Sequence, residues 1–256
     1  MRAVRNTGSG PAVVQVDEPS GDGVLVEVAS SSICGTDLGL VEMGAEGFTL
    51  GHEFAGWVDG VAYAVEPLVA CQSCEECTAG HTNRCTGGRV NLGIFVDGGL
   101  CDRIIVPSRC LVPLPEGLAV GDACLVEPAA VAWHGVRLGG IEPGQRVAVV
   151  GGGSIGLLAA AWARSLGAQV DVAARHDHQG VRAEQVGAGH PSGHYDVVID
   201  AAGSASGLAR CAELARPGAR IVLLGVWTVS SSATGGLLIE KSIQSIIEKV
   251  LKSSSS

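Results

Sequence analysis

The chain has 256 residues, enough for one large domain or two ordinary ones, and 46% of them are apolar, enough to bury a core. Its 38 glycines follow no G-X-Y period, which excludes a collagen-like fibre and indicates many tight turns. The formal charge of −9 argues against nucleic acid or an anionic membrane as a partner. No apolar run reaches the ~20 residues of a membrane-spanning helix, and no apolar segment follows Arg2 and Arg5, so we expect a cytoplasmic protein without a signal peptide.

The first half of the chain is predicted to be rich in β-strands. Apolar residues alternate from Val24 to Val28, and strand-like segments recur at 51–70 and at 100–114. Residues 30–37, around a cysteine, are predicted to form a polar loop. After turns at 115–122, residues 123–138 are predicted to form a helix.

Strands alternate with helices in the second half. Strands are predicted at 145–150, 169–174, 195–200 and 220–224, and helices at 155–166 and 206–214. This βαβ pattern indicates a parallel sheet. We therefore expect a domain at 1–140, with a cysteine-rich lobe at 71–91, and a dinucleotide-binding domain at 141–228. An atypical linker and an amphipathic helix at 229–256 follow, since Ile239, Ile243, Ile246, Ile247, Val250 and Leu251 recur at helical spacing.

Four of the nine cysteines lie in one short polar segment: Cys71, Cys74, Cys77 and Cys85. Four thiolates can surround one Zn²⁺ tetrahedrally with no open position, so the spacing predicts a structural zinc site. Zinc binding would supply the folding free energy that a lobe with few apolar residues lacks. The alternatives are four unrelated buried thiols, and an iron–sulfur cluster, whose usual spacing fits less well.

A second set of metal-ligand types is scattered along the chain. It consists of Cys34, His52 followed by Glu53, and Glu127. A catalytic zinc needs three protein ligands of the nitrogen, sulfur or oxygen type and an open fourth position for water or substrate. Taken singly, each residue is weak evidence, because a lone histidine is more often structural and a lone cysteine is more often an inert, small apolar residue.

The sequence Gly151-Gly152-Gly153-Ser154-Ile155-Gly156 follows a valine-rich strand and opens a helix, as a dinucleotide-binding turn requires. Gly151 permits the tight turn, Gly153 permits close approach of a pyrophosphate, and Gly156 permits helix and strand to pack closely. The helix N-terminus, with Ser154 and Ile155, would stabilise the phosphate charge.

The end of the next strand indicates which dinucleotide binds. NAD sites carry an acidic residue there for the ribose 2′-hydroxyl, whereas this strand ends in Ala174 and Arg175. Asp171 lies in mid-strand and Asp177 comes late. We therefore expect NADP(H) to be favoured over NAD(H), with Arg175 meeting the 2′-phosphate. The alternative is that Arg175 belongs to a solvated loop.

Together these motifs resemble the zinc-dependent medium-chain alcohol dehydrogenase superfamily over residues 1 to about 227. The resemblance is carried by the order of Cys34-Gly35-Thr36-Asp37, Gly51-His52-Glu53, the four-cysteine lobe, Asp97-Gly98-Gly99, Glu127-Pro128, the glycine turn and Asp200-Ala201-Ala202-Gly203. Glu127-Pro128 and His134 resemble the polyol, threonine and sugar dehydrogenase branch. The fold this implies is α/β: a GroES-like, β-rich catalytic domain and a Rossmann domain with a doubly wound parallel sheet.

The resemblance also implies roles for individual residues. Cys34 and His52 would hold the catalytic zinc, and Glu127 would be the third ligand, directly or through water. Glu53 would be an exchangeable ligand or would contact a ligand without binding the metal. Thr36 would start a proton relay, and Asp37 would orient a ligand. Zinc would act as a Lewis acid on an alcohol, whose hydride passes to the nicotinamide. The implied partners are a small alcohol or carbonyl substrate and further copies of the chain in a homodimer or homotetramer.

Two features depart from the family pattern. The segment from Glu53 to Cys71 is short, and the sequence stops soon after Trp227, so we expect a chain shortened at its C-terminal end. The alternative function is therefore a catalytically impaired relative that binds zinc and dinucleotide as a binding or scaffold protein. A zinc-free, quinone-reductase-type enzyme is disfavoured by the cysteine lobe and the zinc ligands.

Overall fold

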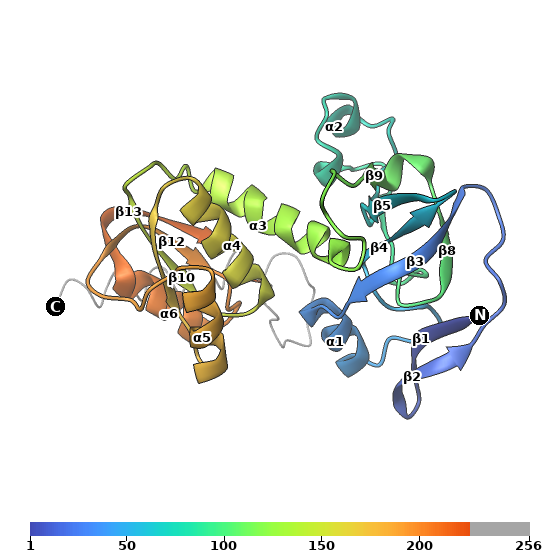
Figure 1. Cartoon of the computed structure of the whole chain (residues 1–256), viewed down its shortest axis with the longest axis horizontal. Helices are drawn as coiled ribbons and strands as arrows, with labels where there is room; N and C mark the ends of the chain where they lie inside the picture. The colour runs from blue at the N-terminus through green and yellow to red at the C-terminus, as the bar shows by residue number, and fades with distance from the viewer. Residues whose placement is uncertain (226–256) are drawn as a thin grey trace. The chain divides into compact units, whose positions relative to one another are not determined.

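The computed structural model describes residues 1–225 (Figure 1). These residues form two compact units, Met1–Glu127 and a second that begins at Pro128. The sequence predicted a boundary near residue 140. The difference lies in helix α3 (Val126–Leu138), whose Ala132 and Val136 belong to the core of the second unit. The amphipathic segment at 229–256 lies outside the described residues.

The first unit is built on a five-stranded antiparallel sheet of order β8-β3-β4-β5-β9. Its strands are β3 (Val24–Ser32), β4 (Glu53–Val58), β5 (Val61–Val65), β8 (Arg103–Val106) and β9 (Leu111–Pro113). Val26, Phe54, Ile104 and Val106 pack together in its core. In β3, Val26 is buried whereas Leu25 and Glu27 are exposed, so the alternation predicted from Val24 to Val28 is confirmed.

Smaller elements surround this sheet. They are a hairpin of β1 (Arg2–Thr7) and β2 (Gly10–Gln15), a two-stranded ladder of β6 (Leu68–Val69) and β7 (Val90–Asn91), helix α2 (Glu75–Thr78), and 3₁₀ turns η1 (Thr82–Arg84), η2 (Ser108–Cys110) and η3 (Ala123–Leu125). The β6–β7 ladder closes the base of the cysteine-rich lobe. The lobe has a small buried cluster of its own, formed by Ala70, Cys77 and Cys85.

The loop predicted at 30–37 is wrong at both ends. Strand β3 continues to Ser32, and helix α1 (Gly35–Glu42) begins three residues later. The helix has no amphipathic pattern, and Gly35 and Gly39 are poor helix formers. A reciprocal capping box stabilises its start instead: Cys34 N donates to Asp37 Oδ2 at 2.8 Å, and the Cys34 side chain faces the Asp37 backbone N–H.

The second unit is built on a parallel sheet of order β11-β10-β12-β13. Its strands are β10 (Arg146–Val150), β11 (Gln169–Ala173), β12 (Tyr195–Asp200) and β13 (Ala215–Leu223), and its other helices are α4 (Ser154–Ser165), α5 (Asp177–Gln185) and α6 (Ala205–Leu214). The chain leaves β10 for β11 on one side and joins β12 on the other. The order of the strands therefore reverses between β10 and β12.

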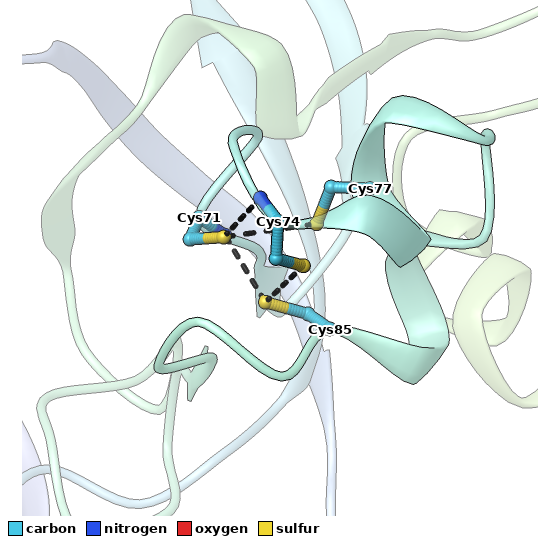
Figure 2. Close-up of side chains that lie close together, drawn as sticks. All are labelled: Cys71, Cys74, Cys77 and Cys85. Atoms are coloured by element: carbon cyan, nitrogen blue, oxygen red, sulfur yellow. Dashed lines mark hydrogen bonds between the residues drawn. The ribbon is translucent and has the colours of Figure 1, made fainter.

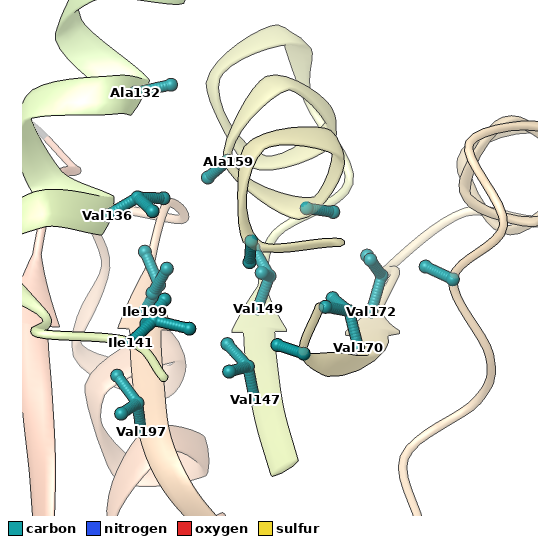
Figure 3. Close-up of a cluster of buried hydrophobic side chains, with 14 of the residues drawn as sticks. Ala132, Val136, Ile141, Val147, Val149, Ala159, Val170, Val172, Val197 and Ile199 are labelled. Carbon is teal, nitrogen blue, oxygen red and sulfur yellow. The ribbon is translucent and has the colours of Figure 1, made fainter. Parts of the chain in front are cut away.

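Helices cover both faces of this sheet, as expected for a doubly wound fold. Val147 and Val149 of β10 pack with α3, α4 and α5 in one cluster, part of which is drawn in Figure 3. Ala148 and Val150 pack with Cys211 and Leu214 of α6 on the opposite face. Strands buried on both faces show continuous apolar runs, which is why β10 was readily predicted.

Two elements differ from the sequence-based expectation. Helix α5 was not predicted, because its sequence is polar and only Ala183 is buried. A capping box between His176 and Gln179 stabilises its start. Strand β13 begins at Ala215, five residues before the predicted start, because Ala215 pairs with Tyr195 beyond a register shift.

Candidate functional site

Asp37 joins the two segments that carry the predicted catalytic ligands. It is 2% exposed; its Oδ2 accepts from Cys34 N at 2.8 Å, and its Oδ1 accepts from Gly51 N at 3.0 Å. Burial opposes the charged carboxylate, but His52 and these two N–H groups hold the pKa of Asp37 below its usual value. Cys34, before α1, and His52, before β4, are thereby brought side by side.

His52 and Glu53 are both buried. The Nδ1 of His52 lies 3.7 Å from Asp37 Oδ1 and has no hydrogen-bond partner among the described residues. Burial disfavours the charged imidazole, but Asp37 and Cys34 outweigh it and raise the pKa of His52 to about 10. The Ser32 hydroxyl, on the neighbouring strand β3, donates to Glu53 Oε2 and orients that carboxylate.

Sulfur, nitrogen and oxygen donor atoms of Cys34, His52 and Glu53 all lie within 4.8 Å of one another. A buried imidazole nitrogen without a partner, next to a thiol and a carboxylate, is a donor set that suits Zn²⁺. Glu127 is not in this group. Burial raises the pKa of Glu127; the charge of His52 lowers that pKa, and the charge of Glu53 raises it. Thr36 lies beside the cluster, with its Oγ1 3.8 Å from Cys34 Sγ.

The four lobe cysteines form a second cluster, drawn in Figure 2. Their sulfur atoms all lie within 4.8 Å, with Cys71 and Cys77 3.9 Å apart and Cys74 and Cys85 4.0 Å apart. Zn–S bonds of about 2.3 Å in a tetrahedron place sulfurs about 3.8 Å apart, so these separations fit one zinc ion. Hydrogen bonds from Ser73 and from Cys74 N lower the pKa of Cys71, which favours the thiolate.

The glycine turn lies at the carboxyl end of β10, where the strand order reverses and ligands of such sheets bind. Gly151 has φ 110°, which favours glycine. A Cβ on Gly156 would overlap the carbonyl oxygen of Gly151, whereas a Cβ on Gly153 would meet nothing within 4 Å. Gly156 therefore permits the packing of α4, and Gly153 leaves open space at the helix N-terminus formed by Ser154 and Ile155.

Arg175 lies in the loop between β11 and α5. The Oε1 of Gln179 accepts from the backbone N–H groups of Arg175 at 3.2 Å and His176 at 3.4 Å. Arg175 lines a pocket of about 480 Å³ at the end of β11, together with His190 and Arg210. Asp177 and Glu184 line the same pocket, but among the described residues Arg175 forms an ion pair with neither.

Asp171 is already engaged elsewhere. Its Oδ2 accepts from the hydroxyl of the fully buried Tyr195 at 2.7 Å and lies 3.7 Å from Arg146. It therefore does not offer a carboxylate at the end of β11. Sequence reasoning missed Ser32, Gln179 and Asp200; only the last belonged to a recognised motif, and none has a local signal for its hydrogen bonds.

Known protein families match both units of the chain. Residues 20–116 match the model of the alcohol dehydrogenase GroES-like domain, and residues 120–211 match that of the alanine dehydrogenase/PNT C-terminal domain. L-galactonate-5-dehydrogenase of Escherichia coli K12 is 34% identical over 245 residues, which cover 83% of this chain and 72% of that protein. For several other curated relatives the chain spans about half of their length, 46% to 50%.

Two solved structures have the same fold. A zinc-binding dehydrogenase of Sinorhizobium meliloti 1021 bound to NADP is 33% identical, with a TM-score of 0.80 over 93% of this chain and 80% of that one. An alcohol dehydrogenase of E. coli CFT073 in complex with NADH is 28% identical, with a TM-score of 0.80 over 91% and 78%.

A GroES-like unit with a cysteine, histidine and glutamate cluster, next along the chain to a Rossmann unit with a glycine turn, defines the class of zinc- and NAD(P)-dependent alcohol oxidoreductases. The chain belongs to the zinc-dependent medium-chain alcohol dehydrogenase superfamily, and its relatives include polyol and sugar dehydrogenases. None of the helices in residues 1–225 is long and apolar enough to cross a membrane.

Proposed function

We propose that the protein transfers a hydride between a secondary alcohol or polyol, or the corresponding carbonyl compound, and NADP(H). The observation that carries the proposal is the convergence of Cys34, His52 and Glu53 within 4.8 Å. A relative named for the 5-dehydrogenation of L-galactonate supports a hydroxyl-bearing, sugar-like substrate.

Zinc bound to Cys34, His52 and Glu53 would supply Lewis acidity, which lowers the pKa of an alcohol near neutrality. Ser32 orients the carboxylate of Glu53, and Asp37 holds Cys34 and His52 in register. The Thr36 hydroxyl lies beside this donor cluster, 3.8 Å from Cys34 Sγ, and would hydrogen-bond to an alcohol bound there. Glu127 adds a second carboxylate whose raised pKa suits exchange of a proton or of a ligand.

The preference for NADP(H) rests on Arg175, which lines a pocket at the end of β11 where the adenosine ribose of a dinucleotide lies in this fold. Asp171, the acidic residue of that strand, is occupied by Tyr195. Relatives bind NADP in one case and NADH in another, so the support comes from the residues of this chain. Assembly as a homodimer or homotetramer, and a cytoplasmic location, are part of the same proposal.

The direct test combines metal analysis with activity. Protein purified without chelator should contain about two zinc ions per chain and should oxidise secondary alcohols or polyols with NADP⁺. Cys34→Ser should retain the structural zinc, lose the other, and lose turnover while still binding NADPH. Wild-type protein without zinc would contradict the proposal, and tight NADPH binding without turnover on any alcohol would favour the catalytically impaired relative.

A matched pair of variants separates the two glutamates. Glu53→Gln should lower the content of the Cys34–His52 zinc, because its carboxylate lies in the donor cluster. Glu127→Gln should keep that zinc and lower turnover. The opposite result would assign the third ligand to Glu127, as the family resemblance implies.

A further inference from the structure

The loop at 201–203 follows β12 and touches the glycine turn. Ala201 N donates to Val150 O at 2.8 Å, and a Cβ built on Gly151 would lie 2.9 Å from both the Ala201 carbonyl carbon and the Ala202 nitrogen. The loop and the turn therefore lie against each other at the carboxyl ends of β10 and β12. This is the point where the strand order reverses and where a ligand binds in such sheets.

The order of the strands indicates which part of a dinucleotide the loop borders. Arg175 follows β11, on one side of β10. In such a fold this side would take the adenosine end of a dinucleotide, and the glycine turn after β10 would take its pyrophosphate. Strand β12 lies on the other side of β10. The loop that follows β12 would therefore border the remaining half of a bound dinucleotide, which carries the nicotinamide.

The side chain of Asp200 holds the backbone of this loop in place. It is the last residue of β12 and is 0% exposed. Its Oδ1 accepts from Ala202 N at 2.9 Å and Gly203 N at 3.3 Å, so one carboxyl oxygen holds two consecutive loop amides. The backbone oxygen of Asp200 also accepts from Leu224 N at 2.8 Å and Gly225 N at 2.9 Å.

The second carboxyl oxygen of Asp200 forms no hydrogen bond that would stabilise the fold. Asp200 Oδ2 is buried without a hydrogen-bond partner among the described residues, and burial raises the pKa of the group. A buried polar atom without a partner destabilises a fold. Burial of Oδ2 therefore lowers the free energy of unfolding, whereas Oδ1 holds the amides of the loop in place.

Two glycines allow neighbouring segments to pack closely against the loop. A Cβ on Gly207, in α6, would lie 2.8 Å from Ala202 Cβ and 3.3 Å from Asp200 Oδ1. A Cβ on Gly225 would overlap the backbone of Gly203. Substitution of Gly207 by alanine would displace the loop without altering the carboxyl group.

We propose that Asp200 is a positioning residue for the dinucleotide, which holds the 201–203 loop in the conformation that receives the nicotinamide half. The inference rests on the proposed binding of a dinucleotide at the glycine turn. It adds to that function a residue that acts through its loop and contacts no reacting atom.

Titration of the zinc-loaded protein tests this role. NADPH and NADH are followed by their fluorescence, and adenosine 2′,5′-bisphosphate, which lacks the nicotinamide half, by displacement. Asp200→Ala should weaken NADPH about tenfold and leave adenosine 2′,5′-bisphosphate within about twofold of wild type. Asp200→Asn keeps an oxygen acceptor for both amides and should stay within about threefold for either probe.

Gly207→Ala should reproduce the selective loss of NADPH, and it carries the test if Asp200→Ala does not fold, since alanine favours a helix over glycine. The matched control is Asp196→Ala, on the same strand. Asp196 accepts from Arg146 N at 2.8 Å and Arg216 Nε at 2.7 Å near the amino end of β12, so both probes should bind as in wild type.

Wild-type affinity for NADPH in Asp200→Ala and Gly207→Ala, or an equal loss of both probes, would overturn the positioning role while leaving dinucleotide binding in place. A control that lost NADPH as strongly as Asp200→Ala would overturn it as well. If wild-type protein bound neither NADPH nor NADH, the proposed function would fail together with this inference.

Discussion

At the scale of the residue, one buried carboxyl group in each candidate site accepts hydrogen bonds from two backbone N–H groups. Asp37 accepts from Cys34 N and Gly51 N, and Asp200 accepts from Ala202 N and Gly203 N. Asp37 therefore joins two segments that are distant in the chain, whereas Asp200 fixes two consecutive amides of one loop. These residues are short and buried, so their geometry is fixed by the backbone around them.

Asp37→Ala should destabilise the protein and release one zinc ion. Two backbone N–H groups would lose their buried acceptor, which corresponds to about 2–4 kcal/mol in the free energy of unfolding. Urea unfolding and metal analysis measure the two effects. Asp97→Ala is the control, because Asp97 also accepts from a backbone N–H, that of Thr49 at 2.7 Å, but is exposed. Full zinc content in Asp37→Ala would contradict the role given to Asp37.

Arg175→Asp should reverse the preference between cofactors. A carboxylate repels a 2′-phosphate and can accept from a ribose 2′-hydroxyl, so the ratio of NADPH to NADH affinity should fall at least about tenfold. Fluorescence titration of both cofactors gives the ratio. Arg182→Asp makes the same charge change on α5 and lies outside the pocket lining, so it should leave the ratio unchanged. An unchanged ratio in Arg175→Asp would remove this residue from the site.

At the scale of the element, binding and packing at the start of helix α4 depend on different glycines. The cap residue Gly153 gives no side-chain hydrogen bond to the helix, so its first N–H groups stay available to an anion. Gly156, one turn further on, packs against the glycine turn itself. The two glycines therefore serve different purposes within one motif.

The variants Gly153→Ala and Gly156→Ala should accordingly fail in different ways. Gly153→Ala should fold with wild-type stability, because its Cβ meets no atom and its φ of −79° is ordinary, yet it should bind NADPH at least about tenfold more weakly. Gly156→Ala should lose stability by about 1–3 kcal/mol, because the methyl group overlaps the Gly151 carbonyl. Thermal unfolding and NADPH titration distinguish them. Wild-type NADPH affinity in Gly153→Ala would place the pyrophosphate elsewhere.

At the scale of the whole molecule, the described chain consists of two units with separate cores. The two predicted zinc sites lie in the first unit and the glycine turn lies in the second. Removal of metal and addition of dinucleotide should therefore act on different parts of the chain.

Hydrogen exchange measured by mass spectrometry tests this separation. A chelator should speed exchange in residues 71–91, since zinc binding supplies the folding free energy of that lobe, and should leave β10 and β12 protected. NADPH at about 100 times its Kd should stabilise the second unit by about 2.7 kcal/mol and slow exchange in β10, α4 and β12. If the chelator sped hydrogen exchange equally in both units, the separation of the two units would be contradicted.

The sequence by itself determined the four strands of the second unit with helices α4 and α6, the four-cysteine lobe and the glycine turn. These signals are local, because apolar runs, cysteine spacing and glycines are each legible within a few residues. It did not determine α1, which has no amphipathic pattern, or α5, whose sequence is polar. Capping boxes that involve Asp37 and Gln179 stabilise the starts of these helices.

Only the tertiary structure decided which residues meet. It grouped Cys34 and His52 with Glu53 and left Glu127 outside that donor cluster, and it engaged Asp171 with Tyr195, 24 residues away. It also placed the buried carboxyl of Asp200 beneath the loop beside Gly151. The physical reason is that coordination and hydrogen bonding depend on distances of a few ångströms, which are set by strand pairing and helix packing between residues far apart in the chain.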